Sequence, residues 1–154
     1  MNVTELDRAI GDAHRAYIDT STCIANLSTT EAAYQAARHL FGRIADDSDP
    51  LVAYISVVSV AEMLVRPIRS GDSRLELVTD FLQNFPNLHI LNTDFAIATQ
   101  AANIRAVARL ALPDALLVGT AIMAACEVII TNDERWARRL APLYPQFRWI
   151  YLGD

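Results

Sequence analysis

Apolar residues follow two different spacings along the chain. LVAYISVV at 51–58 and EVIIT at 127–131 are continuous apolar runs rich in β-branched residues, which is typical of strands buried on both faces of a parallel sheet. Residues 29–47 place apolar side chains three or four positions apart and predict an amphipathic helix. Because such segments alternate, we expect an α/β fold, a parallel sheet sandwiched between helices.

The same reading gives the expected elements. Strands are predicted at 14–19, 51–58, 88–91, 127–131 and 147–152. The segment TSTCIANL after the first strand is expected to open a first helical turn, and helices are predicted at 29–47, 59–67, 72–85, 93–110, 113–125 and 132–141. Thr29 or Thr30 is expected to cap the helix at 29–47 and Thr93 the helix at 93–110, and Pro67 is expected to end the helix at 59–67. Residues 1–15 are expected to add a short helix or an arm before one domain at 16–154.

Composition narrows the class of protein. The chain has 154 residues, of which 53% are hydrophobic, and this suits one compact domain. No apolar run is long enough to span a membrane, and the N-terminus is polar, with no secretory signal. Cys23 and Cys126 lack metal-binding spacing and are expected to be buried free thiols, as in the cytoplasm. All 13 basic residues are Arg, which excludes chemistry that needs lysine, such as a P-loop or a Schiff base.

Four acidic residues follow apolar segments near the expected ends of strands. Asp19 ends the first strand, Glu62 lies in the helix after the second, Asp114 begins a helix, and Asp133 follows EVIIT. Each has an ordinary explanation, because Asp often caps helices or complements the helix dipole, and Glu62 can pair with Arg66 one turn later. Ligands in α/β sheets bind outside the carboxyl ends of the strands, where these acids are expected to converge.

A group of four acids at one edge would repel unless a cation neutralised it. Carboxylates are the ligands of hard divalent cations, and such an ion can activate water for attack on a phosphodiester. Ser21, Thr131 and Asn132, together with the Thr20 hydroxyl, can supply supporting hydrogen bonds. Other chemistries are disfavoured, because the three His residues are scattered and no Ser or Cys lies in a recognisable nucleophile motif.

Four motifs together resemble the PIN-domain nucleases, most closely the VapC-like toxins of toxin–antitoxin pairs. They are IDTST at 18–22, VSVAEML at 58–64, LPDALLVGTAI at 112–122 and IITND at 129–133. The resemblance runs from about residue 15 to the C-terminus. It implies a PIN-like domain whose metal-binding and catalytic residues are Asp19, Glu62, Asp114 and Asp133, supported by Ser21 and Thr131. Val118 stands where some members carry a further acid.

The resemblance also implies an activity and partners. The expected activity is Mg²⁺-dependent, or Mn²⁺-dependent, cleavage of RNA in the cytoplasm, with an antitoxin protein as inhibitor and a homodimer as the usual unit. The alternative is a PIN-like module that binds RNA or protein without cutting. Five arginines near the acids are candidate RNA phosphate contacts, although a solvated helix face explains them equally: Arg105, Arg109, Arg135, Arg138 and Arg139.

Overall fold

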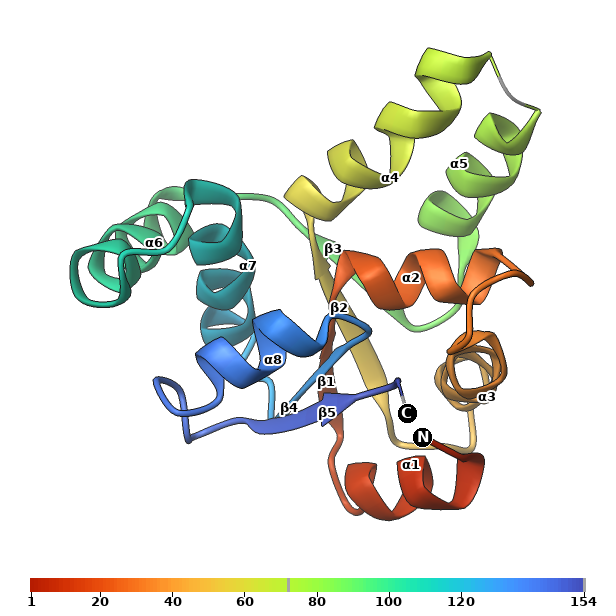
Figure 1. Cartoon of the computed structure of the whole chain (residues 1–154), viewed down its shortest axis with the longest axis horizontal. Helices are drawn as coiled ribbons and strands as arrows, with labels where there is room; N and C mark the ends of the chain where they lie inside the picture. Colours follow the sequence, from red (N-terminus) through yellow and green to blue (C-terminus); the bar gives the residue numbers. More distant parts are fainter. Residues whose placement is uncertain (72, 154) are drawn as a thin grey trace.

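A computed structural model describes residues 1–71 and 73–153 and contains one five-stranded parallel sheet (Figure 1). The strands are β1 (Arg15–Ile18), β2 (Val52–Ser56), β3 (Leu88–Leu91), β4 (Val128–Thr131) and β5 (Arg148–Tyr151). They are ordered β3-β2-β1-β4-β5, and every neighbouring pair is parallel. The expected α/β fold with helices around a parallel sheet is therefore confirmed.

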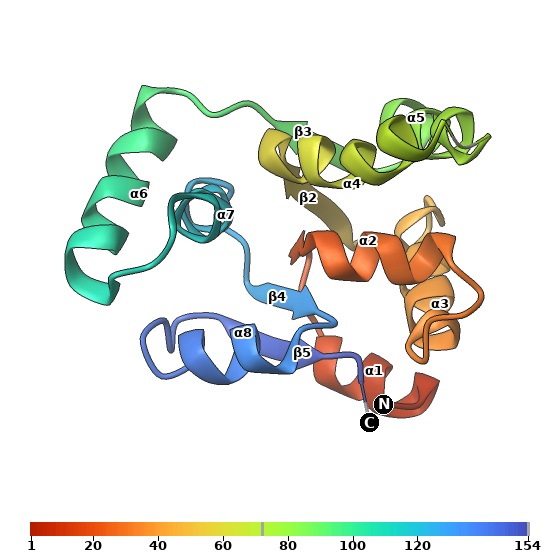
Figure 2. The same ribbon diagram turned by 45° about the horizontal axis from the view of Figure 1, so that its top comes forward.

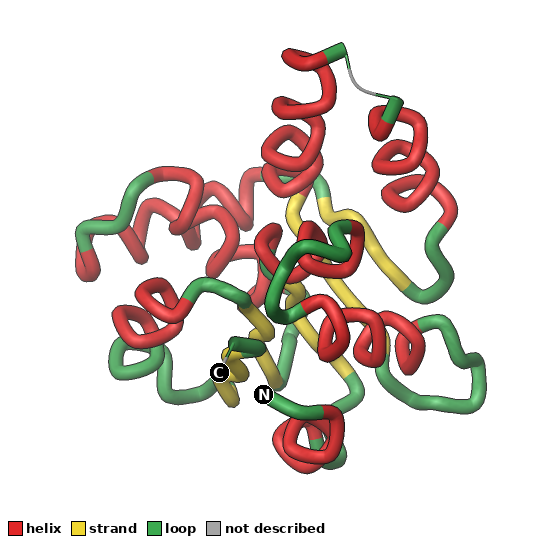
Figure 3. Tube along the Cα trace, turned by 45° about the vertical axis from the view of Figure 1, so that its right-hand side comes forward, coloured by secondary structure: helices red, strands yellow, loops and turns green. Residues whose placement is uncertain are grey.

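Helices cover both faces of the sheet (Figure 2). They are α1 (Val3–Ile10), α2 (Thr20–Leu27), α3 (Tyr34–Ile44), α4 (Val57–Ser70), α5 (Arg74–Asn84), α6 (Phe95–Ala108), α7 (Leu112–Met123) and α8 (Glu134–Leu140). One core cluster lies under α1, α2, α3 and α5, and the other lies under α6, α7 and α8. Helices α4 and α5 also extend away from the sheet as a pair (Figures 1 and 3).

The strands are mostly apolar because they supply both clusters. Ile18 of β1 and Ile130 of β4 belong to the first cluster. Their neighbours Tyr17 and Ile129 belong to the second. All four side chains are fully buried. Burial of apolar surface stabilises the fold by about 25 cal/mol per Å², so a strand buried on two faces gains from every residue.

The N-terminal segment forms a helix rather than an extended arm. A capping box begins α1, in which Glu5 N–H donates to Asn2 and Asn2 N–H donates to the Glu5 side chain. Leu6 and Ile10 are fully buried, and α1 packs against α3 and β5. This segment therefore belongs to the same core as the rest of the molecule.

Two predicted helix caps are wrong. Neither Thr29 nor Thr30 caps α3, because residues 28–34 form consecutive turns in which the Ser28 and Thr30 hydroxyls bond each other, and the helix begins only at Tyr34. For α6, the cap is Asp94 and not Thr93. The Asp94 side chain accepts a 2.8 Å hydrogen bond from Ile97 N–H.

The end of β2 and both ends of α4 also differ from the prediction. The Ser56 side chain caps α4 by accepting a hydrogen bond from Val58 N–H, so the helix begins at Val57, inside the predicted strand. Pro67 does not end α4, which continues to Ser70 and closes at Gly71 in a left-handed conformation. A proline in the last turns of a helix removes one hydrogen bond there, and the buried ring of Pro67 packs under the helix.

Helices α6 and α7 pack closely where α7 carries Gly119. A Cβ atom at this position would lie 3.3 Å from the carbonyl oxygen of Ile97 and 3.4 Å from the backbone nitrogen of Ala101. The absence of a side chain therefore allows the two backbones to approach. Among the described residues, no single helix is long and apolar enough to cross a membrane, and only the pair α6 and α7, bent by 120°, passes that test together.

Candidate functional site

Asp19 lies where β1 ends and α2 begins, and it caps that helix. Its side chain is only 7% exposed. The carboxylate Oδ2 accepts hydrogen bonds from Ser21 Oγ at 2.5 Å and from Thr131 Oγ1 at 2.8 Å, with a longer one from Ser21 N–H. Because β1 and β4 are neighbours in the sheet, residues 112 positions apart in sequence meet at this carboxylate.

Burial dominates the electrostatics of Asp19. It raises the pKa of the carboxyl group, whereas hydrogen bonds from Ser21, Thr131 and the backbone of α2 act in the opposite direction. None of these stabilising groups is a cation. Among the described residues, the partners of this desolvated carboxylate are hydroxyl and N–H groups.

The corner between β4 and α8 carries Asp133. Its Oδ1 accepts hydrogen bonds from Arg135 N–H at 2.9 Å and Trp136 N–H at 3.1 Å, so it caps α8. Its own N–H donates to Thr131 Oγ1 at 3.0 Å. Asn132 contributes through its backbone, whose N–H donates to Ser21 Oγ at 2.9 Å. Asp133 is therefore a helix cap, as its ordinary explanation predicts. Both capping bonds end on Oδ1, and Oδ2 takes no part in them.

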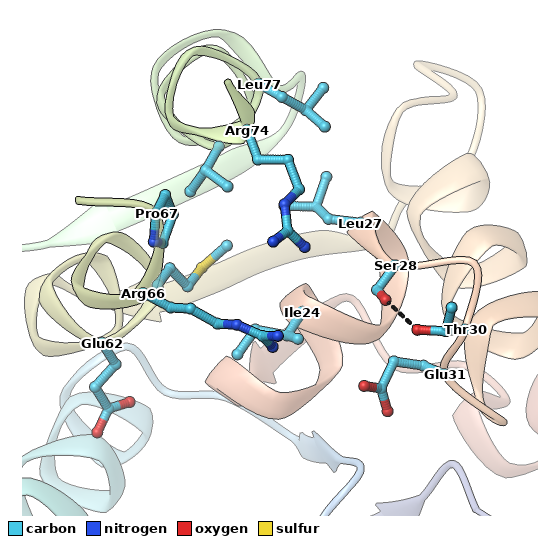
Figure 4. Close-up of a pocket in the computed structure, with 12 residues that line it drawn as sticks. Ile24, Leu27, Ser28, Thr30, Glu31, Glu62, Arg66, Pro67, Arg74 and Leu77 are labelled. Carbon is cyan, nitrogen blue, oxygen red and sulfur yellow. Dashed lines mark hydrogen bonds between the residues drawn. The ribbon is translucent and has the colours of Figure 1, made fainter. Parts of the chain in front are cut away.

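Glu62 lies on the exposed side of α4 and reaches the start of α2. Its Oε2 accepts a 2.5 Å hydrogen bond from Thr20 Oγ1, which in turn lies 2.9 Å from Ser59 Oγ. Sequence reasoning did not single out Ser59, because its only signal is its position one turn before Glu62. The possible ion pair with Arg66 does not form within the described residues, and the two side chains point in different directions (Figure 4).

Asp114 lies in the first turn of α7, half-buried, after Pro113. In residues 1–71 and 73–153 its carboxylate has no hydrogen-bond or ion-pair partner. The N-terminus of α7 has no side-chain cap at all, so Asp114 is not a capping residue. Of the ordinary explanations for an acid at this position, only a favourable interaction with the dipole of α7 still applies.

The four predicted acids therefore differ in their surroundings. The Thr131 hydroxyl links Asp19 to Asp133, because it donates to the Asp19 carboxylate and accepts from the Asp133 N–H. Glu62 belongs to a separate group of hydrogen bonds with Thr20, the residue that follows Asp19 in the chain. Asp114 lies outside both groups. Across the described part of the chain, no three His, Cys, Asp or Glu side chains are placed closely enough to hold a metal ion. The four-acid metal site stays a prediction.

The five candidate arginines are all exposed and lie on α6, the loop that follows it, and α8. Arg139 donates to the backbone oxygen of Arg109, so α8 and this loop are neighbours. Arg105 donates to the backbone oxygen of Leu110, and Arg138 pairs with Glu134 in the same helix. Their role as phosphate contacts stays a prediction.

A cavity of about 170 Å³ lies between α2, α4 and α5. Apolar side chains line most of it, among them Ile24, Met63 and Leu77, with Glu62 and Arg66 at one side (Figure 4). It therefore runs from the acidic residues toward the projecting helix pair.

Comparison with known families identifies the class of protein. The PIN domain model matches residues 16–141, a span that includes all four acids and the whole sheet except β5. The chain belongs to the PIN domain family. A search of the curated proteins finds no significant match.

Solved structures with the same fold come from several bacteria. A toxin–antitoxin complex from Klebsiella pneumoniae is 21% identical, with a TM-score of 0.65 and coverage of 90% of this chain and 98% of that one. VapC20 of Mycobacterium tuberculosis, described as a sarcin–ricin loop-cleaving toxin, is 17% identical, with a TM-score of 0.62 and coverage of 80% and 93%. VapBC2 of Rickettsia felis, bound to a promoter DNA fragment, is 17% identical, with a TM-score of 0.61 and coverage of 89% and 98%.

Proposed function

We propose that this protein is a metal-dependent endoribonuclease that acts as the toxin of a toxin–antitoxin pair. The observation that carries the proposal is the buried Asp19 carboxylate, which the Thr131 hydroxyl joins to the backbone N–H of Asp133, while Glu62 accepts a hydrogen bond from Thr20, the residue next to Asp19. Taking a carboxylate out of water is costly unless a partner compensates it, and a bound cation would be such a partner. The PIN domain supplies the context for nuclease chemistry.

The side chains present fit Mg²⁺ or Mn²⁺. All the available donors are oxygens, which these hard cations prefer. Asp19, Glu62, Asp114 and Asp133 would hold the metal, and Asp114 has a carboxylate with no other described partner. When bound, the ion supplies an activated water and stabilises the phosphodiester oxygens.

The remaining residues orient these acids and attract the substrate. Ser21 and Thr131 fix the Asp19 carboxylate by donating to Oδ2, and Asn132 fixes Ser21 through its backbone. The exposed arginines of α8 and of the loop after α6 contact RNA phosphates. Such contacts position RNA without reading its sequence.

The partners follow from the same proposal. A toxin needs an antitoxin, and the similarity in fold to the Klebsiella pneumoniae toxin–antitoxin complex supports one. A homodimer would bury the outer face of α6, where Phe95 is 88% exposed and Val107 is 84% exposed. The protein would act in the cytoplasm, and its two buried free thiols, Cys23 and Cys126, are consistent with a reducing compartment.

Cleavage of a pooled RNA substrate tests the function. The wild type is expected to cut in Mg²⁺ or Mn²⁺ and to stop in EDTA, and Asp19→Asn is expected to be inactive in either metal. Asp12→Asn is the matched control, because Asp12 is exposed and precedes β1, at the end of the strands opposite to the acids. A wild-type protein that binds RNA but never cuts it would instead identify a non-catalytic PIN-like module.

A further inference from the structure

Ser59 and Thr20 form a buried hydroxyl pair directly behind Glu62. Ser59 is fully buried and Thr20 is 7% exposed, whereas Glu62 itself lies on an exposed part of α4. Thr20 Oγ1 lies 2.9 Å from Ser59 Oγ and 2.5 Å from Glu62 Oε2. A rigid buried pair thus holds one oxygen of a flexible surface side chain.

We propose that Thr20, supported by Ser59, is the positioning residue that fixes Glu62 for metal binding; this inference rests on the proposed function. A hydroxyl has one proton, and an ionised carboxylate is the stronger acceptor, so the Thr20 proton goes to Glu62. Ser59 Oγ, 2.9 Å away, is the other acceptor within reach of this hydroxyl. Oε2 is engaged by this bond, and Oε1 is left for the cation.

The need for such a device follows from the position of Glu62. A glutamate side chain has three rotatable bonds, and within the described residues Thr20 is the one hydrogen-bond partner of this carboxylate. Asp19 and Asp133 are each held by at least two donors, because each also caps a helix. Without the Thr20 hydroxyl, Glu62 would sample many orientations, and each bound metal ion would have to select one.

The position of Thr20 beside Asp19 also brings two of the acids together. Thr20 follows Asp19 directly. The first turn of α2 therefore follows Asp19 and also holds Glu62, which lies in α4 after the neighbouring strand β2. Helices α2 and α4 pack against each other at this point. The Thr20 hydroxyl therefore ties Glu62 to the helical turn that carries Asp19.

Thr20→Val tests the proposal, because it removes the hydroxyl and keeps the shape. Titration calorimetry with Mn²⁺ alone is expected to show affinity reduced about 10- to 100-fold, as found when groups that orient metal ligands are removed. Cleavage of pooled RNA is expected to lose kcat with KM unchanged. Thr20→Ser restores the hydroxyl and is expected to bind Mn²⁺ within about threefold of wild type, and Ser59→Ala is expected to fall between the two.

Thr22→Val is the matched control. Thr22 lies in the same helix, is also buried, and donates to the backbone oxygen of Ile130 instead of to an acid. It is expected to bind Mn²⁺ and cut RNA as the wild type does. Thermal unfolding in EDTA shows whether each variant is folded.

The outcomes separate the inference from the function on which it rests. Wild-type Mn²⁺ affinity in a folded Thr20→Val variant would overturn the role of Thr20 and leave the nuclease proposal intact. Equal losses in Thr20→Val and Thr20→Ser would also overturn it, since only the shape of the side chain would then matter. A wild-type protein that neither binds Mn²⁺ nor cuts RNA would remove both proposals together.

Discussion

Substituting Asp114 tests the metal site most cleanly, because its carboxylate has no described bond to lose. Asp114→Asn keeps the size of the side chain and removes one charge from the first turn of α7. The lost interaction with the helix dipole is worth about 0.3–1 kcal/mol, and relief of repulsion among the acids acts in the opposite direction. For a chain of this length, 1 kcal/mol changes Tm by about 2–4 °C, so Tm in EDTA should fall by at most about 4 °C.

The same substitution should have a large effect once metal is present. A cation at 100 times its Kd stabilises a folded protein by about 2.7 kcal/mol, which corresponds to a rise in Tm of about 5–10 °C for the wild type. Asp114→Asn should show a much smaller rise. Cleavage should fall by about a hundredfold or more, because a bound metal lowers the reaction barrier by several kcal/mol and each 1.36 kcal/mol is a factor of ten.

Asp94→Asn is the control for this experiment. It removes the same charge from the start of α6, and asparagine retains the capping bond to Ile97. Thermal unfolding and cleavage measured on the same preparations, with EDTA and with Mn²⁺, give the comparison. Equal Mn²⁺-induced rises in Tm for wild type and Asp114→Asn, together with unchanged cleavage, would refute the assignment of Asp114 as a ligand.

Three further predictions concern the rest of the molecule. Arg43 holds Asp49 through bonds of 2.7 and 3.3 Å and lowers the pKa of that carboxyl, so Asp49→Asn should cost about 1–3 kcal/mol in urea unfolding at pH 7. This stabilisation is present above the ordinary Asp pKa and is lost as pH falls through the lowered value; a difference that stays constant down to pH 2 would contradict it. Sedimentation at tens of micromolar should show a dimer that Phe95→Glu with Val107→Glu dissociates, and a monomeric wild type would exclude it. Gly119→Ala should lower the free energy of unfolding by about 1–3 kcal/mol, because its Cβ would crowd the backbone of α6; an unchanged Tm would show that the helices separate freely.

The strands could be predicted from the sequence because each serves two cores. A segment such as residues 127–131 has no polar face, and only a strand in the middle of a parallel sheet needs that pattern. Helix ends were harder, because several polar residues compete to be the cap. Thr93 and Asp94 are adjacent and both suit the role, and in the structure Asp94 takes it.

The candidate site was predictable only in part for a related reason. Acids after apolar strands can be found in sequence, and the Thr131 hydroxyl does join Asp19 to the Asp133 backbone, while Glu62 accepts a hydrogen bond from Thr20 beside Asp19. Ser59 could not be found, because a serine in an apolar helix carries no signal until its packing against Thr20 is known. The alternative pairing of Glu62 with Arg66 also depended on side-chain direction, which spacing along a helix leaves open.

The hydrogen bond from Thr131 to Asp19 has a consequence for the timing of synthesis. It spans 112 residues, and β4 must be added beside β1 before the two side chains meet. Residues up to the end of β4 must therefore leave the ribosome before this hydrogen bond can form. If the protein is the nuclease proposed above, a nascent chain that ends before β4 would lack the support that Thr131 gives to Asp19.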